Sequence, residues 1–488
     1  MSSVSNMNKS FTNALFIVIL IFLLLFVIAK RSKTYSVTLS ESGFRPQVLT
    51  INKGDRIKFS NILNRSFWPA SDPHPTHVFF AGFDSKKEIH SNDTWTYEFQ
   101  KSGQWAYHDH LDPSVRGQIT VVETNPVISF YQKIVHIYKT KFIKHDELFL
   151  KRQNNVCNKS IDDHGLFLDC WTSFVADFTR DFGVSEAMRQ LTKIYDLGFL
   201  TKGECHYLSV QVGTDAYWQF VSGKKFEFTK DFSLCDAGFF HHFMSEHVSH
   251  GKDFIGSENL CDSLVGVDKD LVGQCYFGMG NGLTYYYWNL YSNDSKKIVS
   301  ESLLKCDKVK SVFKDRCVYG VYSGIDHIFE GQHGSGLTVN LNNPFELCQM
   351  QKVAPYKDSC YERMIPSISS ALNHDVVYNL PVLNYWVQRI PLKSSKTAAT
   401  RTLGRMISEL EAVKPNPQFE NVLNICRNEP LGLRVDCLWG AFHNILINSL
   451  SPTSKIGQTS CKDMNYILNN EFYICIDAQK VVEGLDLK

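Results

Sequence analysis

Fourteen cysteines constrain the fold of this chain more than any other feature, because all of them follow residue 150 and their spacing is regular. Six pairs are separated by 11 to 14 positions and a seventh by 30. Buried free thiols and zinc ligands are the alternatives, but no CxxC motif occurs and the histidines do not accompany the pairs. We therefore predict seven local disulfides, which are typical of oxidising compartments. The predicted pairs are Cys157 with Cys170, Cys205 with Cys235, Cys261 with Cys275, Cys306 with Cys317, Cys348 with Cys360, Cys426 with Cys437, and Cys461 with Cys475.

The same cysteines define an internal repeat. The second members of successive pairs, at positions 275, 317 and 360, are 42 and 43 residues apart, while those at 360 and 437 are 77 apart and those at 437 and 475 are 38 apart. A glycine stands three positions after several of them, as in Cys275-Tyr-Phe-Gly278. Residues three apart share one face of a helix, and glycine on that face lets a neighbouring backbone approach closely.

The segments between the cysteines are typical of buried helices. Gly282 to Leu290 and Ala441 to Leu450 are apolar and aromatic runs without proline, and they do not alternate as strands do. A unit of about 40 residues with two helices predicts an α-solenoid, so we assign residues 125–488 to an all-α helical-repeat domain. This region resembles an uncharacterised cysteine-bearing helical-repeat region of exported bacterial proteins, related in outline to tetratricopeptide arrays. The resemblance implies no chemistry.

Sequence motifs of catalysis are missing from this helical region, which has no Ser-His-Asp order, phosphate-binding loop or HExxH segment. His242 and Glu246 would lie one turn apart on a helix and suggest a metal site, but a half-buried aromatic helix with a polar outer face explains them better. We expect His206, beside Cys205, to be a hydrogen-bonded structural residue. Whether the protein is an enzyme stays open, and we favour a protein without catalytic activity.

An apolar segment near the N-terminus directs the chain to a membrane. Ala14 to Ala29 is apolar without interruption, and three basic residues follow it at positions 30, 31 and 33. At roughly 1.5 Å per residue the run is a little short of the ~30 Å hydrocarbon core, yet longer than most signal-peptide cores. Residues 1–33 are thus either a signal anchor or a signal peptide cleaved after Ala29.

The orientation of the chain rests on two opposing signals. Basic residues after an apolar segment tend to stay in the cytoplasm, but seven disulfides require an oxidising environment and outweigh them. We expect the bulk of the chain to be extracytoplasmic, on a single-pass membrane protein or on a secreted one.

Charge and length exclude one class of partner and set the domain count. Lys and Arg number 51 against 50 Asp and Glu, which gives a net charge of +1 at pH 7. There is no basic field to attract nucleic acid. A chain of 488 residues exceeds the size of a single hydrophobic core, so two or more domains are expected.

Residues 34–124 form short β runs broken by Gly, Pro and Asn. Tyr35 to Leu39 opens this region, and apolar residues then alternate with polar ones from Phe44 to Asn61. Gly54 and Asp55 interrupt the second run, and we expect them to form a hairpin turn between two paired strands.

The remaining runs complete the sheet prediction. Thr94 to Phe99 and Gly103 to Tyr107 are expected to form a second hairpin, and Gly117 to Val122 closes the sheet. About seven strands in roughly 90 residues predict a β-sandwich.

The order of these strands, with a histidine-bearing strand at His77 and a histidine-rich loop after Tyr107, resembles the cupredoxin family over about one fifth of the chain. The resemblance implies a Greek-key β-sandwich and a copper site that takes one ligand from His77 and the others from a loop of form FHCxxHxxMxG. Laid without gaps on this sequence, that pattern has Asp109 at the Cys, Asp112 at the His and Val115 at the Met. A blue type 1 centre is excluded, because no thiolate is present.

Nitrogen and oxygen donors remain around this loop. His108 and His110 are two positions apart, so a strand would point both to one side, and they resemble the His-x-His of multicopper oxidases. Imidazole and carboxylate without sulfur suit Cu(II), with zinc as a competitor. The expected direct ligands are His77, His108 and His110, with His74 as a weaker candidate and Asp109 or Asp112 as an oxygen ligand or as the acceptor that fixes an imidazole tautomer. The alternative is a degenerate cupredoxin whose polar loop only caps the sandwich.

Two functions follow. The first is an extracytoplasmic, membrane-tethered protein that binds copper at this His/Asp site, for capture, delivery or modest redox work. The second is a scaffold without metal, whose helical-repeat domain binds a protein or polymer partner. A multicopper oxidase ranks below both, because it needs a second cupredoxin domain and a cysteine-linked site.

Overall fold

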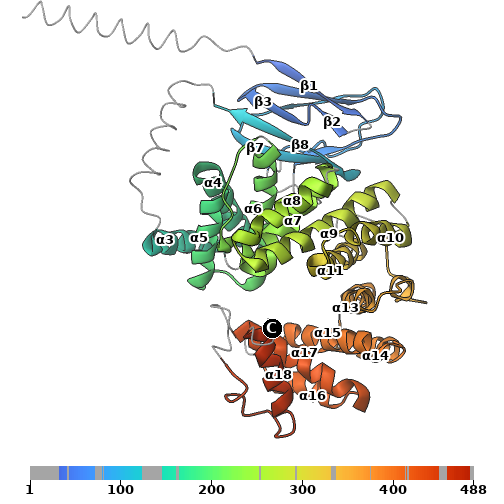
Figure 1. The fold of residues 1–488 in the computed structure, drawn as a ribbon. Coiled ribbons are helices and arrows are strands. Elements are labelled where there is room, and N and C mark those ends of the chain that lie inside the picture. Colours follow the sequence, from blue (N-terminus) through green and yellow to red (C-terminus); the bar gives the residue numbers. More distant parts are fainter. Residues whose placement is uncertain are drawn as a thin grey trace, which may run out of the picture. The chain divides into compact units, whose positions relative to one another are not determined.

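The computed structural model describes residues 32–40, 43–71, 80, 82–123, 146–160, 164–221, 223–251, 254–291, 294–330, 337–373, 375–412, 414, 417–449 and 459–483. The chain divides into two compact units, Met1–Gln132 and Lys133–Lys488. Among the described elements, the first unit contains the strands and the second the helices (Figure 1). Within the described residues, no helix is both long and apolar enough to cross a membrane. The predicted apolar segment Ala14 to Ala29 lies outside them.

Two four-stranded sheets form the first unit, in the orders β2-β1-β4-β6 and β3-β8-β7-β5. The pairs β1–β4 and β3–β8 are parallel and the other pairs antiparallel. The predicted β-sandwich is therefore confirmed. Its described strands are β1 (Thr34–Ser40), β2 (Gly43–Arg45), β3 (Val48–Asn52), β4 (Arg56–Asn61), β5 (Pro69–Ser71), β6 (Trp95–Glu98), β7 (Gly103–Asp109) and β8 (Asp112–Val122).

Both predicted hairpins are wrong. A tight turn does exist at Gly54, which has a φ of 89°, but it links β3 in one sheet to β4 in the other. In the same way β6 pairs with β4, whereas β7 pairs with β5 and β8. Strands of both sheets of a sandwich bury one face and expose the other. The alternating pattern therefore identifies strands without revealing their partners.

Tyr107 occupies the centre of the sandwich core, one residue before the candidate ligands. Its ring centroid lies 4.9 Å from that of Phe44 and 5.5 Å from those of Phe59 and Phe83. Gly117 is its partner in β8, where an added Cβ would come within 2.5 Å of the Tyr107 ring. This packing fixes the end of β7 that carries the histidines.

The described part of the second unit is helical. Its α-helices are α3 (Glu147–Cys157), α4 (His164–Phe182), α5 (Val184–Asp196), α6 (Lys202–Val221), α7 (Leu234–Gly251), α8 (Phe254–Ser263), α9 (Lys269–Tyr291), α10 (Ser295–Cys306), α11 (Ser311–Phe329), α12 (Glu346–Gln349), α13 (Ala354–Ala371), α14 (Leu380–Gln388), α15 (Lys393–Ala412), α16 (Phe419–Arg427), α17 (Leu431–Ser449) and α18 (Phe472–Val482). Single 3-10 turns are η2 (Asn158–Ser160), η3 (Lys230–Ser233) and η4 (Leu264–Gly266).

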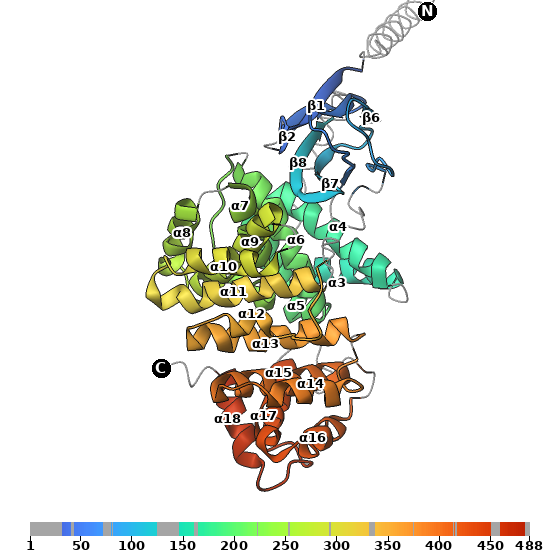
Figure 2. The ribbon, with the colours of Figure 1, turned by 90° about the vertical axis from the view of Figure 1, so that its right-hand side faces the viewer.

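Long helices of this unit pack in sequence order, α6 on α7, α7 on α9, α9 on α11, α11 on α13, α13 on α15 and α15 on α17. A shorter helix precedes each one from α9 onward (Figure 2). This stacking of helix pairs agrees with the two-helix repeat expected from the cysteine spacing.

Seven disulfides join the same pairs that the spacing predicts. Five of them tie a short helix to the long helix that follows it: α3 to α4, α8 to α9, α10 to α11, α12 to α13, and α16 to α17. The pair α14 and α15 has none. Ala399 occupies the cysteine position of α15, so the 77 residues between Cys360 and Cys437 are two repeats of 39 and 38 residues.

Close helix contacts explain the glycine three positions after the cysteine. A Cβ added to Gly278 of α9 would lie 2.1 Å from the carbonyl oxygen of Phe240 in α7. One added to Gly440 of α17 would lie 1.9 Å from that of Arg401 in α15. Any side chain there would push the two helices apart, so glycine sets the spacing of the repeats.

Candidate metal centre

A tight hairpin replaces the expected ligand loop. Only two residues separate β7 from β8, and Asp109 is the register partner of Asp112. His108 pairs with Arg116 in the same ladder, and the register shifts between His108 and Asp109. Backbone pairing therefore holds the candidate ligands at the end of the sandwich.

The imidazoles of His108 and His110 lie near each other, with ring centroids 6.2 Å apart. His108 is fully buried. The His110 backbone N–H donates to the Trp68 carbonyl at 2.6 Å, and the two rings are 4.5 Å apart. The Trp68 ring thus packs against one side of the His110 ring.

Asp109 is fully buried and its carboxylate is already engaged. Oδ2 lies 2.7 Å from Nη1 of Arg65, and Oδ1 accepts from the backbone N–H groups of Trp68 at 2.7 Å and Leu111 at 3.2 Å. Burial raises the pKa of Asp109, and these donors oppose that rise. The carboxylate joins the end of β7 to the segment before β5.

Asp112 is more accessible, with 41% of its side chain exposed, and its carboxylate lies 3.7 Å from Arg65. Asp84 accepts from the Trp68 indole N–H at 2.6 Å. Neither Arg65 nor Asp84 was predicted from the sequence as a residue of this site. A buried carboxylate requires a cation or several donors, so a search for a basic partner of Asp109 is the signal that would have found Arg65.

The predicted ligands His74 and His77 lie outside the described residues. Among the residues that the structure does describe, no group of three or more His, Cys, Asp or Glu is arranged to hold a metal. The first unit has no cysteine, so its donors do not fit a blue copper centre. The two imidazoles of His108 and His110 fit Cu(II) in their chemistry.

Histidines of the helical unit have structural partners. The His206 Nδ1 lies 2.8 Å from the Cys235 carbonyl oxygen, which confirms the expected hydrogen bond. The His242 Nδ1 lies 3.0 Å from the Thr214 hydroxyl and 3.6 Å from the Glu246 carboxylate. The latter pair is an intrahelical contact.

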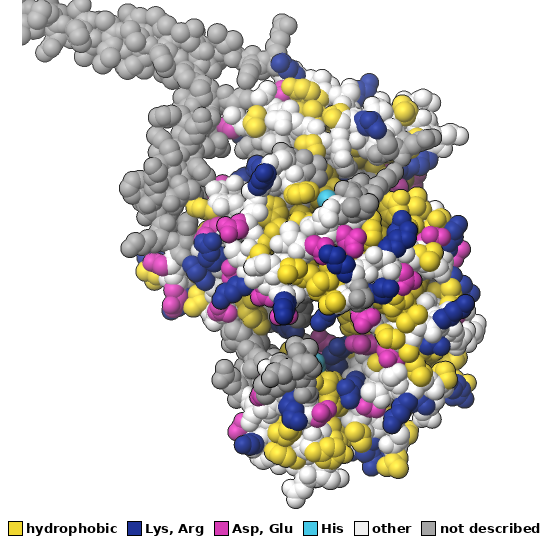
Figure 3. Space-filling view, in the orientation of Figure 1, with side chains coloured by type: hydrophobic (Ala, Val, Ile, Leu, Met, Phe, Trp, Pro, Cys, Tyr) yellow, Lys and Arg dark blue, Asp and Glu magenta, His cyan; other side chains and the backbone are white. Residues whose placement is uncertain are grey.

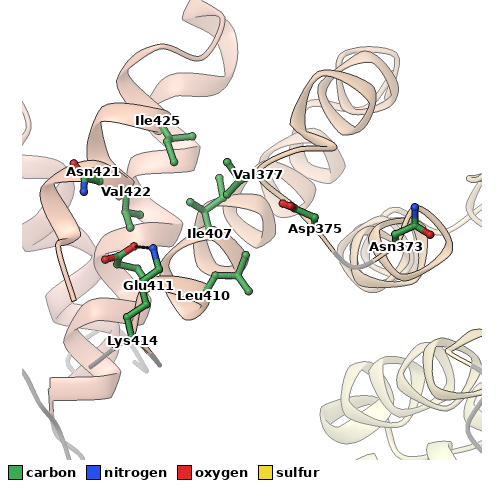
Figure 4. Close-up of a pocket in the computed structure, with 10 residues that line it drawn as sticks. All are labelled: Asn373, Asp375, Val377, Ile407, Leu410, Glu411, Lys414, Asn421, Val422 and Ile425. Carbon is green, nitrogen blue, oxygen red and sulfur yellow. Dashed lines mark hydrogen bonds and ion pairs between the residues drawn. The ribbon is translucent and has the colours of Figure 1, made fainter. Parts of the chain in front are cut away.

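A pocket opens between helices α15 and α16 and the segment that joins α13 to α14 (Figure 4). Its volume is about 550 Å³. Glu411 and Lys414 form an ion pair of 2.6 Å at one end. The lining residues are Asn373, Asp375, Val377, Ile407, Leu410, Glu411, Lys414, Asn421, Val422 and Ile425. They contain no nucleophile–base pair, so the pocket carries no catalytic arrangement.

Comparisons with known proteins agree with the first unit. The family model described as a cupredoxin-like domain matches residues 13–121. No curated protein matches the chain. Three of the similar solved structures are the novel purple cupredoxin from Nitrosopumilus maritimus (18% identity, 18% of this chain and 98% of that one, TM-score 0.16), a reduced amicyanin mutant (15%, 19% and 87%, TM-score 0.17) and oxidised plastocyanin from Dryopteris crassirhizoma (14%, 18% and 100%, TM-score 0.16). The chain thus carries a cupredoxin-like domain, followed by a disulfide-rich helical region.

Proposed function

We propose that the cupredoxin-like domain binds copper as Cu(II) through imidazoles at the pole that carries His108 and His110. The family commonly binds copper, and the proposal rests on one observation, the 6.2 Å separation of these two rings on a backbone-paired hairpin. Imidazole donors without sulfur favour Cu(II) among the common divalent ions, with zinc as the competitor.

His77 and His74 complete the proposed ligand set. Asp109 has a different role, because both of its oxygens already accept hydrogen bonds. Its contacts with Arg65 and Trp68 hold the end of β7 in place, so Asp109 positions the histidines. Asp112, which is partly exposed and lies 3.7 Å from Arg65, is the carboxylate that we propose as an oxygen ligand.

Capture or delivery of copper outside the cytoplasm is the function that this donor set supports best. Fast blue-copper electron transfer needs a thiolate, and this domain has none. Seven disulfides are typical of an extracytoplasmic protein. The apolar segment Ala14 to Ala29 supports attachment to a membrane and would hold the domain near its surface.

Copper titration of the full chain tests the proposal. Calorimetry is expected to give one copper per chain, and paramagnetic resonance is expected to show nitrogen couplings without the intense blue thiolate absorption. His108→Ala and His110→Ala should each weaken binding by about tenfold or more. His90→Ala is the matched control, since His90 lies in the same domain and its Nδ1 lies 2.8 Å from the Ser66 hydroxyl. Wild-type affinity in His110→Ala would refute the site.

A further inference from the structure

A ladder of side chains runs along the long helices of the second unit at one repeat position, two residues after the cysteine or its Ala399 equivalent. We call it the inner ladder, and its members are Phe277, Tyr319, Glu362, Arg401, Trp439 and Asp477. The repeats keep this position at one place on each helix, so residues distant in sequence come side by side.

Consecutive members are in contact within two stretches of the ladder. The rings of Phe277 and Tyr319 are 6.0 Å apart, and the Tyr319 hydroxyl donates to Glu362 at 3.0 Å. At the other end the guanidinium of Arg401 lies 3.9 Å from the Trp439 ring, whose N–H donates to Asp477 at 2.8 Å. The ladder thus contains two polar and aromatic stretches, Phe277 to Glu362 and Arg401 to Asp477.

Arg363, beside the ladder, has an incompletely satisfied guanidinium. It lies 4.4 Å over the Tyr319 ring, and its Nε is buried without a hydrogen-bond partner. Its side chain hydrogen-bonds Tyr319, and the charges of Asp326 and Glu362 act on it, although neither carboxylate forms an ion pair with it. A buried N–H donor without an acceptor is costly, so this position favours an acceptor from outside.

Neighbouring carboxylates are already occupied. Glu362 accepts from Tyr319 and lies 3.3 Å from Arg405. Asp326 accepts from the Ser367 hydroxyl, and burial raises its pKa to about 7. Neither carboxylate forms an ion pair with Arg363, although both lie near enough to act on its charge.

Two imidazoles, those of His241 and His327, lie near enough to the guanidinium to feel its charge, and a third lies beside them. His241 and His327 stack with ring centroids 5.0 Å apart, and His206 lies 5.8 Å from His241. Burial and then neighbouring positive groups lower the pKa of His241 and that of His327, the latter to about 3. The rings of His241 and His327 are therefore neutral donors or acceptors at pH 7. A cation is disfavoured beside Arg363, in keeping with the lack of a metal-holding group among the described residues.

We propose that this inner surface binds an oxyanion, a carboxylate or phosphate group, with Arg363 as its anchor. A guanidinium offers paired N–H donors that match either group. The guanidinium of Arg363 lies over the Tyr319 ring. Neutral imidazoles and the Arg405 guanidinium stand near to complete the donor set. Figure 3 shows a hollow in the helical unit with acidic, basic and histidine side chains at its wall. This site is independent of the copper proposal.

Calorimetry of the full chain with inorganic phosphate, and separately with succinate, tests the proposal and distinguishes the two sources of the oxyanion. At least one of them is expected to bind, and Arg363→Gln should weaken binding by about tenfold or more. Arg363→Lys keeps the charge without the fork and should give an intermediate affinity. Arg389→Gln is the matched control, because its guanidinium also lies over a tyrosine, 3.4 Å from the Tyr385 ring on α14.

Thermal unfolding supplies an independent readout. The bound anion should raise the melting temperature of wild type and of Arg389→Gln, and should leave that of Arg363→Gln unchanged. The proposal is overturned if neither anion binds at millimolar concentration, or if Arg389→Gln loses binding as much as Arg363→Gln does.

Discussion

Arg65 Nη1 lies 2.7 Å from Asp109 Oδ2, so a buried ion pair stands at the position where the blue-copper pattern has its thiolate. The Asp109 carboxylate is shielded from water while Arg65 keeps about a third of its side chain exposed, at 0% and 35% respectively. The end of β7 is thus held by charge in a place where a cupredoxin holds it by metal ligation.

Arg65→Gln should destabilise the first unit by about 3 kcal/mol, because it leaves a buried carboxylate without its cation. Arg56→Gln removes a comparable pair with Glu98, but the side chains there are 54% and 34% exposed. Its expected cost is under about 1 kcal/mol. Urea unfolding followed by tryptophan fluorescence measures both, and equal costs for the two variants would argue against a stabilising role for the Arg65 pair.

Trp68 should report on copper at the proposed site, because its ring lies 4.5 Å from that of His110. Copper is expected to quench the fluorescence of the wild type, and Trp68→Phe should lose most of that quenching while its affinity stays within about threefold. Trp439→Phe, in the helical unit, is the control and should retain the quenching. Quenching that survives in Trp68→Phe would move the metal elsewhere.

Asp326 should make stability depend on pH. Burial raises its folded-state pKa from 3.8 to about 7, so between these values the folded protein retains a proton that the unfolded chain releases. Stability from this group is present below pH 4 and is lost as the pH rises to 7. Asp326→Asn removes this loss, so the variant's free energy of unfolding should exceed that of the wild type by a margin that grows to roughly 2 to 4 kcal/mol at pH 8. Denaturant unfolding of both proteins at pH 4 and pH 8 measures this margin. The same margin at both pH values would contradict the prediction.

The helix pair without a disulfide should accept one. Val387 and Ala399 are both buried and are 12 residues apart, as Cys348 and Cys360 are. The double variant Val387→Cys, Ala399→Cys should form an eighth disulfide and gain about 2 to 3 kcal/mol. Mass spectrometry after alkylation detects it. Val382→Cys with Ala399→Cys is the control, since Val382 is 43% exposed on the same helix, and its thiols should remain free.

Gly440→Ala should cost about 1 to 3 kcal/mol, because its Cβ would lie 1.9 Å from the Arg401 carbonyl oxygen. Gly432, in the same helix α17, has nothing within 4 Å of an added Cβ. Gly432→Ala should therefore be neutral or stabilising by up to about 1 kcal/mol. Circular dichroism during thermal unfolding compares the two, and a stable Gly440→Ala protein would contradict the close helix contact.

Local patterns predicted much of the fold. The cysteines pair with their nearest neighbours in sequence, and alternation marked most strands, so both were readable from short segments. The sheet partners of β6 and β7 were not, because strands on the two sheets carry the same alternation. Arg65 was not predicted, because its partner Asp109 is 44 residues away and no sequence pattern around Arg65 indicates a site residue.

The inner ladder escaped for another reason. Its members differ in chemistry, from Phe277 to Asp477, so no composition signal connects them. They share a repeat position only when Ala399 is aligned with the cysteines. That alignment can be made only once the place of α15 among the packed helices is known.

Every disulfide joins two cysteines that are consecutive along the chain. A polypeptide that is threaded N-terminus first into an oxidising compartment can close each bond before the next cysteine emerges. The order of emergence then favours the native partners, because each cysteine meets its own partner before any other.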